Sequence, residues 1–382
     1  MTLIEASTVR PFFGVEPVVN ACGIYTDLGG SCLSPTVWEA ASAANAAFAP
    51  IPDLLDRSGE TIAEMISVTA ARVVPGASAG IALAVAACMA RSDGELMQSL
   101  PEVHGGRCEV VLQRVHRYKY ARCATPAGGQ IVEAGGEQGT TQEQLIDAIG
   151  ERTAAVLVPA HLDGHAGSLP LAEVARIAHA RQVPVIVDAA YMSYPTTLLG
   201  SYAAAGADLT CFSAKYFWGP NAGGFICGGQ ELVDAVRMID FTGYESGRYL
   251  TFGRIFKLDR ATIVATVLAL QEWLALDHEA RWADYSERAR ALVERIEPAL
   301  PGAVSAACFT LDERVVDEPV NSLVVTLADP GAARLAEVLA EGSPPIHSLA
   351  EKDRVIFCLE TVAARDDDLI AERILSALPS DA

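Results

Sequence analysis

Short apolar runs rich in β-branched residues alternate with segments of helical period between residues 109 and 229. The runs predict strands at residues 109–113, 129–133, 154–159, 183–188, 208–213 and 223–229. Helices are predicted between them, for example at 141–149, which begins at a capping box, and at 170–182. Because strands and helices alternate, the pattern predicts an α/β domain with a mostly parallel sheet.

Further helices are predicted on both sides of this region. Alanine dominates residues 35–48, and residues 53–74 place apolar side chains at helical spacing, which predicts a second helix with one buried face. A turn of small residues at 75–80 opens a third helix, at 81–89. Residues 257–276 predict a long apolar helix that leads out of the domain.

The composition shifts at residue 277. The segments that follow predict helices at 280–296, 332–340 and 366–378 and strands at 304–311, 322–327, near 346 and at 354–359. Such a mixture is typical of a smaller α+β unit. We therefore predict an N-terminal arm (1–17), a large domain (18–276) and a small C-terminal domain (277–382).

Two charged residues stand where predicted buried strands end. Asp188 closes the run that begins at Val183, and Lys215 follows the run that ends at Ser213. This pair suits pyridoxal phosphate (PLP), since a lysine can form the Schiff base while a carboxylate keeps the pyridine nitrogen protonated. Asp188, Ser213 and Lys215 are therefore predicted cofactor contacts, and Asp188 and Lys215 are predicted to be catalytic.

The turn before the helix at 81–89 is a candidate phosphate site. Small residues at a helix start leave backbone N–H groups free at the positive end of the helix dipole, which suits a dianion. We predict that Ser78, Ala79 and Gly80 hold the cofactor phosphate. Tight packing is the alternative explanation for small residues at this position.

A basic and aromatic segment follows the strand at 109–113. An imidazole at the carboxyl end of a strand in an open α/β sheet can stack on a cofactor ring, so His116 is a further catalytic and cofactor-binding candidate. Arg117 and Tyr118 are possible substrate contacts. A structural role for His116 is the alternative.

A third candidate segment is His161-Leu-Asp163-Gly-His165, in which ligand-type side chains alternate. A metal site is one interpretation, but no fourth ligand is evident in the sequence. We predict that no metal binds and that His161 lines a substrate pocket, because the segment lies just past a strand end.

Several of these motifs together resemble a known family. Asp188-Ala-Ala, Gly206-Ala-Asp-Leu, Phe212-Ser-Ala-Lys215 and Gly219-Pro220 are similar to the fold type I PLP-dependent enzymes. Within them, Val18–Gly30 and Val111–Arg117 resemble the branch that contains selenocysteine synthase and D-glucosaminate-6-phosphate ammonia-lyase. The motifs extend over roughly residues 15 to 275. Tyr216 and Trp218 depart from the pattern of that branch, which places its substrate specificity in question here.

The resemblance implies an aspartate aminotransferase-like fold, with a mixed, mostly parallel seven-stranded sheet in the large domain. It also implies at least a homodimer with the active site at the subunit interface. Tyr25 and Thr26, at the centre of a glycine-rich loop, are then expected to reach the substrate, although an ordinary turn is equally compatible with the loop. Arg354 lies near the position where such enzymes often bind a substrate carboxylate, and a solvated arginine is the alternative.

The implied chemistry is deprotonation at Cα of a small amino acid or amino sugar acid. β-Elimination of the ammonia-lyase type is the expected outcome, and racemisation, aldol cleavage or group transfer are alternatives that the same lysine and aspartate permit. A non-catalytic α/β assembly protein is the alternative outside the enzymes. Loss of Lys215 or Asp188 would favour that alternative, and both are present.

Charge and cysteine content limit the partners. The net charge is −20, with 28 Lys and Arg against 48 Asp and Glu, which disfavours a nucleic-acid surface and hence a tRNA substrate. The family motif begins near residue 18, which we expect to leave no room for a separate tRNA-binding domain. Nine cysteines without a Cys-x-x-Cys pair predict reduced thiols. We see no signal peptide or membrane span and expect a cytoplasmic enzyme.

Overall fold

The computed structural model describes residues 13–311 and 314–378, which form parts of two compact units. The large unit is Ser31–Ala275, and the small unit joins Met1–Gly30 to Leu276–Ala382. The observed division differs from the predicted domains at residues 18–30, which we placed in the large domain. Residues 1–12 of the predicted N-terminal arm lie outside the described residues.

A seven-stranded sheet forms the centre of the large unit. Its strands are β2 (Ala70–Val74), β3 (Glu109–Gln113), β4 (Gln130–Ala134), β5 (Thr153–Pro159), β6 (Val185–Asp188), β7 (Leu209–Ser213) and β8 (Gly224–Gly228). They lie in the order β2-β8-β7-β6-β5-β3-β4, and β8 runs in the direction opposite to the other six strands. The predicted mixed, mostly parallel sheet is confirmed.

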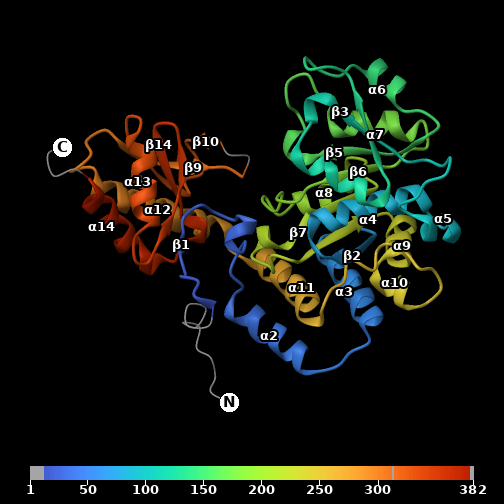
Figure 1. Cartoon of the computed structure of the whole chain (residues 1–382), viewed down its shortest axis with the longest axis horizontal. Coiled ribbons are helices and arrows are strands. Elements are labelled where there is room, and N and C mark those ends of the chain that lie inside the picture. Colours follow the sequence, from blue (N-terminus) through green and yellow to red (C-terminus); the bar gives the residue numbers. More distant parts are fainter. Residues whose placement is uncertain (1–12, 312–313, 379–382) are drawn as a thin grey trace. The chain divides into compact units, whose positions relative to one another are not determined.

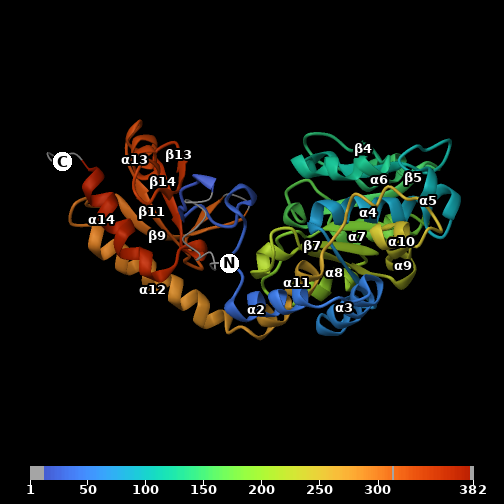
Figure 2. The same cartoon turned by 60° about the horizontal axis from the view of Figure 1, so that its bottom comes forward.

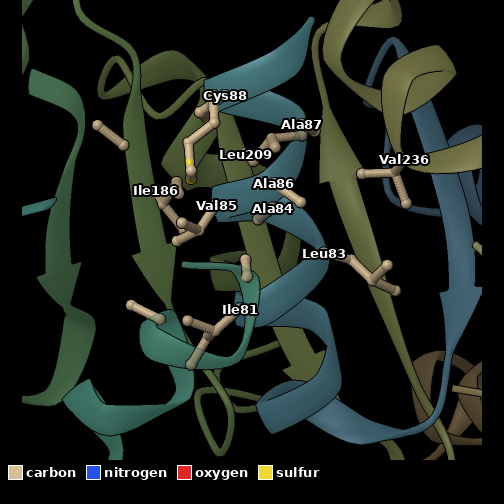
Figure 3. Packing of buried hydrophobic residues seen from close by; sticks show 14 of the residues in the cluster. Ile81, Leu83, Ala84, Val85, Ala86, Ala87, Cys88, Ile186, Leu209 and Val236 are labelled. Carbon is tan, nitrogen blue, oxygen red and sulfur yellow. The ribbon is translucent and has the colours of Figure 1, made fainter. Parts of the chain in front are cut away.

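Helix α4 (Gly76–Ala90) lies against this sheet with almost no exposed surface. Every residue of α4 except Ser78 is buried. Figure 3 shows Val85 and Cys88 beside Ile186 of the sheet, and Leu83 on the side of Val236. A helix that is apolar all round is typical of a buried core element, so α4 holds its N-terminus at a fixed position relative to the strands.

The other helices of the large unit lie around the sheet and α4 (Figures 1 and 2). They are α2 (Pro35–Ala46), α3 (Ile51–Met65), α5 (Gly94–Ser99), α6 (Gln142–Ala148), α7 (Leu171–His179), α8 (Leu198–Ala204), α9 (Gln230–Ile239), α10 (Phe241–Glu245) and α11 (Arg260–Ala275). In the part of the chain that the structure describes, no helix has the length and hydropathy needed to cross a membrane.

The helix predicted at 53–74 is wrong in its second half. Helix α3 ends at Met65, Ser67 takes a left-handed φ of 57°, and the chain continues as the edge strand β2. All five residues of β2 are buried, and they pair with β8, whose sequence lies about 150 positions further on. Pairing with a distant strand overrides the local helical period here.

A buried ion pair fixes β2 to its surroundings. Arg72 is almost fully buried, and its guanidinium donates to the carboxylate of Asp240 at 2.7 and 2.9 Å and to Asp56 at 2.6 Å. Thr242 Oγ1 accepts a further hydrogen bond from the same group. The network joins the edge strand to α3 and to the start of α10.

The small unit contains a second, antiparallel sheet of five strands in the order β10-β9-β11-β14-β13. They are β9 (Val304–Phe309), β10 (Val315–Val316), β11 (Ser322–Thr326), β13 (Leu349–Glu351) and β14 (Arg354–Cys358), with helices α12 (His278–Ile296), α13 (Gly331–Ala340) and α14 (Asp367–Ala377). Strand β1 (Val19–Asn20) pairs in parallel with β12 (Ile346–His347). This pairing explains why residues 18–30 group with the small unit.

Candidate active site

Asp188 and Lys215 come from neighbouring parallel strands. Asp188 is the last residue of β6 and lies opposite Cys211 of β7, and β7 ends two residues before Lys215. Because parallel strands end at the same edge of a sheet, both side chains belong to the edge at which open α/β folds bind ligands. The structure thus brings together the two residues on which the cofactor prediction depends.

The carboxylate of Asp188 is held by two neutral donors. The residue is 4% exposed. The Tyr118 hydroxyl donates to Oδ2 at 2.7 Å, and the Ala190 N–H donates to Oδ1 at 3.1 Å. Burial raises the pKa of Asp188, and the two hydrogen bonds oppose that rise. A buried carboxylate without a described cationic partner is a suitable counter-charge for a protonated ring nitrogen.

Lys215 lies in a short 3-10 helix, η6 (Ala214–Phe217), and is 8% exposed. Its Nζ lies 4.9 Å from the centre of the Tyr216 ring. The backbone around it is fixed, because the Ala214 N–H donates to the Gly223 carbonyl at 2.9 Å and the Gly219 N–H donates to the Ala214 carbonyl at 2.8 Å. The Gly219-Pro220 turn that marks the family in the sequence therefore holds the lysine in place.

Four ring side chains form a row in which Tyr118, at one end, contacts Asp188 and Tyr216, at the other end, contacts Lys215. Ring centres are 5.6 Å apart for Tyr118 and His161, 5.2 Å for His161 and Tyr191, and 5.8 Å for Tyr191 and Tyr216. The row comes from the segments that follow β3, β5, β6 and β7. His161, predicted as a pocket residue, is part of it. Tyr191 was missed, although its place three residues after Asp188 at a strand end was a usable signal.

Of the predicted phosphate residues, Ser78 and Ala79 lie in the first turn of α4 and Gly80 begins the second, at the same edge of the sheet. Strand β2 precedes α4 and is parallel to β7, since both are antiparallel to β8. Gly76 begins the helix with a φ of 80°, and no side chain caps the helix N-terminus. In the register, Val74 and Ser213 flank Gly224, so Ser213 and the start of α4 are close.

These residues fit PLP. The uncapped N-terminus of α4, where Ser78 is exposed and Ala79 and Gly80 are buried, offers backbone donors to a phosphate. Burial raises the pKa of the nearby Cys123 thiol, and the Ser78 hydroxyl partly opposes that effect, so Cys123 stays a neutral neighbour. A phosphate site, a buried amine and a buried carboxylate at one sheet edge are the three features that the cofactor requires.

His116 is placed differently from the other candidates. It ends the short helix η3 (Arg114–His116), is fully buried, and neither ring nitrogen makes a hydrogen bond of ordinary geometry within the described residues. Its pKa is lowered to about 4, mainly by burial; the backbone of Leu162 opposes the fall, and the charges of His165 and His161 add to it. A neutral imidazole at this place is compatible with the predicted ring contact, which stays a prediction.

Other predicted substrate contacts are not part of the row of rings. Arg117 is more than half exposed, and its guanidinium makes two hydrogen bonds of 2.6 Å to the carboxylate of Glu133. Tyr25 and Thr26 lie at the short helix η2 (Thr26–Leu28) of the small unit. Arg354 is in the same unit and pairs with Glu351 at 3.0 Å. Their predicted roles stay predictions.

The segment His161–His165 does not form a metal cluster. Asp163 Oδ1 accepts the Leu171 N–H at 2.9 Å, and His165 is exposed. Among the residues that the structure describes, no group of three or more His, Cys, Asp or Glu side chains is arranged to hold a metal ion. The nine cysteines all lie among the described residues, none of them is in a disulfide, and only Cys32 is exposed.

The fold and the site define a PLP-dependent enzyme of fold type I. The chain belongs to this family: residues 130–324 match the DegT/DnrJ/EryC1/StrS aminotransferase family, and the relatives below are similar over most of the chain. The 5'-C-glycyluridine monooxygenase-decarboxylase of Streptomyces sp. is 33% identical over 341 residues, which is 87% of this chain and 82% of that protein.

Two further comparisons place the chain within the family. The D-glucosaminate-6-phosphate ammonia lyase of Salmonella typhimurium is 34% identical over 266 residues, or 68% of each chain. A solved structure of D-glucosaminate-6-phosphate ammonia-lyase superposes with a TM-score of 0.82 at 27% identity and covers 97% of both chains. The L-seryl-tRNA(Sec) selenium transferase of Nitratidesulfovibrio vulgaris is 27% identical over 92% of this chain. The branch expected from the sequence motifs is confirmed.

Proposed function

We propose that this protein is a PLP-dependent ammonia lyase that acts on an amino sugar acid. The observation that carries the proposal is the pairing of Asp188 and Lys215 at one sheet edge, in a fold that superposes on D-glucosaminate-6-phosphate ammonia-lyase over nearly its whole length. Overall, a 2-amino-3-hydroxy acid would lose its Cα proton and its Cβ hydroxyl as water. Hydrolysis would then regain that water, giving a 2-oxo-3-deoxy acid and ammonium.

PLP, when bound, supplies an electron sink for the bonding pair at Cα. Asp188 would keep the ring nitrogen protonated, because a buried carboxylate stabilises a positive charge beside it. Lys215 would hold the cofactor and, when a substrate amine replaces its own, would take the Cα proton. The row of rings at its side would exclude water from the deprotonated Cα.

The remaining residues would bind and orient the cofactor and the substrate. Ser78, Ala79, Gly80 and Ser213 would hold the phosphate, and His116 would contact the cofactor ring. His161 and Arg117, with Tyr25, Thr26 and Arg354 of the small unit, are our candidates for substrate contacts. The large unit, Ser31–Ala275, would thus be the cofactor-binding domain.

A second candidate reaction follows from the other relative. The 5'-C-glycyluridine monooxygenase-decarboxylase is similar to 87% of this chain, whereas the D-glucosaminate-6-phosphate ammonia lyase is similar to 68% of it. Such a reaction would require O2 and release CO2 from a glycyl substrate. Oxygen uptake and CO2 release therefore separate it from ammonia release.

We further propose a cytoplasmic enzyme that acts on a small molecule as a homodimer or larger homo-oligomer, because a net charge of −20 disfavours nucleic-acid partners and the family resemblance implies a shared active site. Light scattering at micromolar concentration tests the oligomer. A mass equal to one chain contradicts it.

The first test of function is the cofactor itself. We expect the purified protein to be yellow, and borohydride to remove the colour and leave a reduced pyridoxyl group on the peptide containing Lys215. The holoprotein is then incubated with D-glucosaminate 6-phosphate and with unphosphorylated D-glucosaminate, and ammonium and 2-oxo acid are measured. Equal amounts of both products support the lyase. If the cofactor is fixed on Lys215 but neither compound yields ammonium, the substrate class is wrong and the PLP assignment stands.

A further inference from the structure

We propose that Tyr118 is a positioning residue for Asp188, which it acts on through the hydrogen bond from its hydroxyl to Oδ2. The bond is 2.7 Å long and joins residues 70 positions apart in the sequence. The proposed role of Tyr118 concerns the cofactor and not the substrate, so it does not depend on which reaction the enzyme catalyses.

The local backbone directs Tyr118 inward while its neighbours point outward. Tyr118 is extended (φ −148°, ψ 162°) between the short helices η3 and η4 (Lys119–Ala127). Arg117 and Lys119 on either side are exposed, whereas Tyr118 is half-buried and its ring packs edge-on against His161. The backbone conformation at Tyr118 therefore favours its contact with Asp188.

Asp188 needs this donor because its carboxylate is buried and the thiol and phenol groups that interact with it electrostatically stay neutral. Cys123, Cys211 and Tyr216 lie within electrostatic range of the carboxylate, and burial raises the pKa of each. No described cation pairs with Asp188, and its only other hydrogen bond comes from the Ala190 N–H. Two donors must therefore balance the cost of burying the charge.

Tyr118 is well suited to remain a donor. Burial strongly raises the pKa of its phenol, and the Asp188 charge adds to the effect, so the hydroxyl keeps its proton across the range in which enzymes work. The bond also leaves the carboxylate with one orientation. Because Oδ1 and Oδ2 each accept from one donor, the carboxylate cannot rotate without breaking both bonds. Its remaining lone pairs therefore keep a fixed direction.

The test is Tyr118→Phe, which removes one oxygen and keeps the ring. PLP affinity is measured by equilibrium titration of the apo-proteins from pH 6 to pH 8.5, and the variant is compared with the wild type at each pH. Loss of the donor raises the pKa of Asp188 further, so a larger fraction of the carboxyl group is protonated at pH 6 than at pH 8.5. We expect affinity to fall about tenfold at pH 6, the size of one hydrogen bond to a charged group, and the deficit to shrink towards pH 8.5.

The protonation of free PLP changes with pH in the same way for both proteins and cancels in the ratio of their affinities. Tyr202→Phe is the matched control, since it removes the hydroxyl of a buried tyrosine of the same unit on α8, whose ring packs against Phe212. We expect the control to match the wild type at every pH. A Tyr118→Phe deficit that is constant with pH identifies a loss of packing and overturns the proposal, as does the absence of any deficit. Failure of the wild type to bind PLP instead contradicts the cofactor assignment.

Discussion

The Ser193 hydroxyl donates a hydrogen bond of 2.7 Å to the carbonyl of Tyr216, the residue that follows Lys215. Ser193 is itself fixed, because its carbonyl accepts the indole N–H of Trp273 at 2.8 Å. Trp273 also packs edge-on against Trp218, three residues after the lysine. The backbone that carries Lys215 is thus tied to the loop after β6 and to helix α11.

Ser193→Ala is expected to loosen this support without removing the lysine. We expect a loss of about 1 kcal/mol in stability, the usual contribution of one hydrogen bond, and a several-fold lower kcat with PLP retained. Thermal melting and turnover measure the two effects. Ser201→Ala is the control, because Ser201 also donates to a carbonyl, that of Leu198, but on the exposed side of α8. Equal effects of both substitutions would contradict a specific role for Ser193.

Asp188→Asn separates chemistry from binding. The amide is nearly isosteric but cannot stabilise a protonated ring nitrogen by charge. The activation free energy should therefore rise by about 3 kcal/mol, which lowers turnover roughly a hundredfold. The protein should still retain PLP through Lys215 and the first turn of α4. Absorbance of the bound cofactor and turnover on ammonia-releasing substrates are the two measurements. Near wild-type turnover with bound PLP means that Asp188 does not contact the ring nitrogen.

The lowered pKa of His116 predicts that the stability of the protein depends on pH. Its pKa in the folded protein is about 4, below the ordinary value of 6.5, so the unfolded chain binds a proton between these values that the folded protein does not. Stability therefore decreases as the pH falls from 6.5 to 4, by up to about 3 kcal/mol for this residue. In His116→Gln, the urea unfolding free energy of the apo-protein should depend less steeply on pH over this window. Identical slopes for variant and wild type would show that His116 titrates normally.

Asp240→Ala tests the buried network at the sheet edge. The substitution leaves Arg72 with Asp56 alone as a charged partner, so we expect a destabilisation of about 3–5 kcal/mol. Chemical denaturation measures it. Glu60→Ala removes the partner of the exposed Arg57 and should change stability by less than about 1 kcal/mol. A small effect of Asp240→Ala would mean that water replaces the lost carboxylate as a hydrogen-bond partner of Arg72.

The sequence was most informative where a local pattern ends at a functional residue. Asp188 and Lys215 could be predicted because short buried strands stop at charged side chains, and both positions agree with the structure. The same reasoning failed for β2, whose pattern is compatible with a helix and whose partner β8 is distant in sequence. The hydrogen bond from Tyr118 to Asp188 was not predicted, because nothing local in the sequence indicates a contact between residues 70 positions apart.

Helix α4 has a consequence for how this enzyme could acquire new substrates. With every side chain except Ser78 enclosed, a larger residue almost anywhere along it would disturb the sheet as well as the helix. Evolutionary change is thereby directed to segments that follow the strands, such as those that carry His161 and Tyr191. Substitutions there can alter what enters the pocket while the scaffold that orients the cofactor keeps its shape.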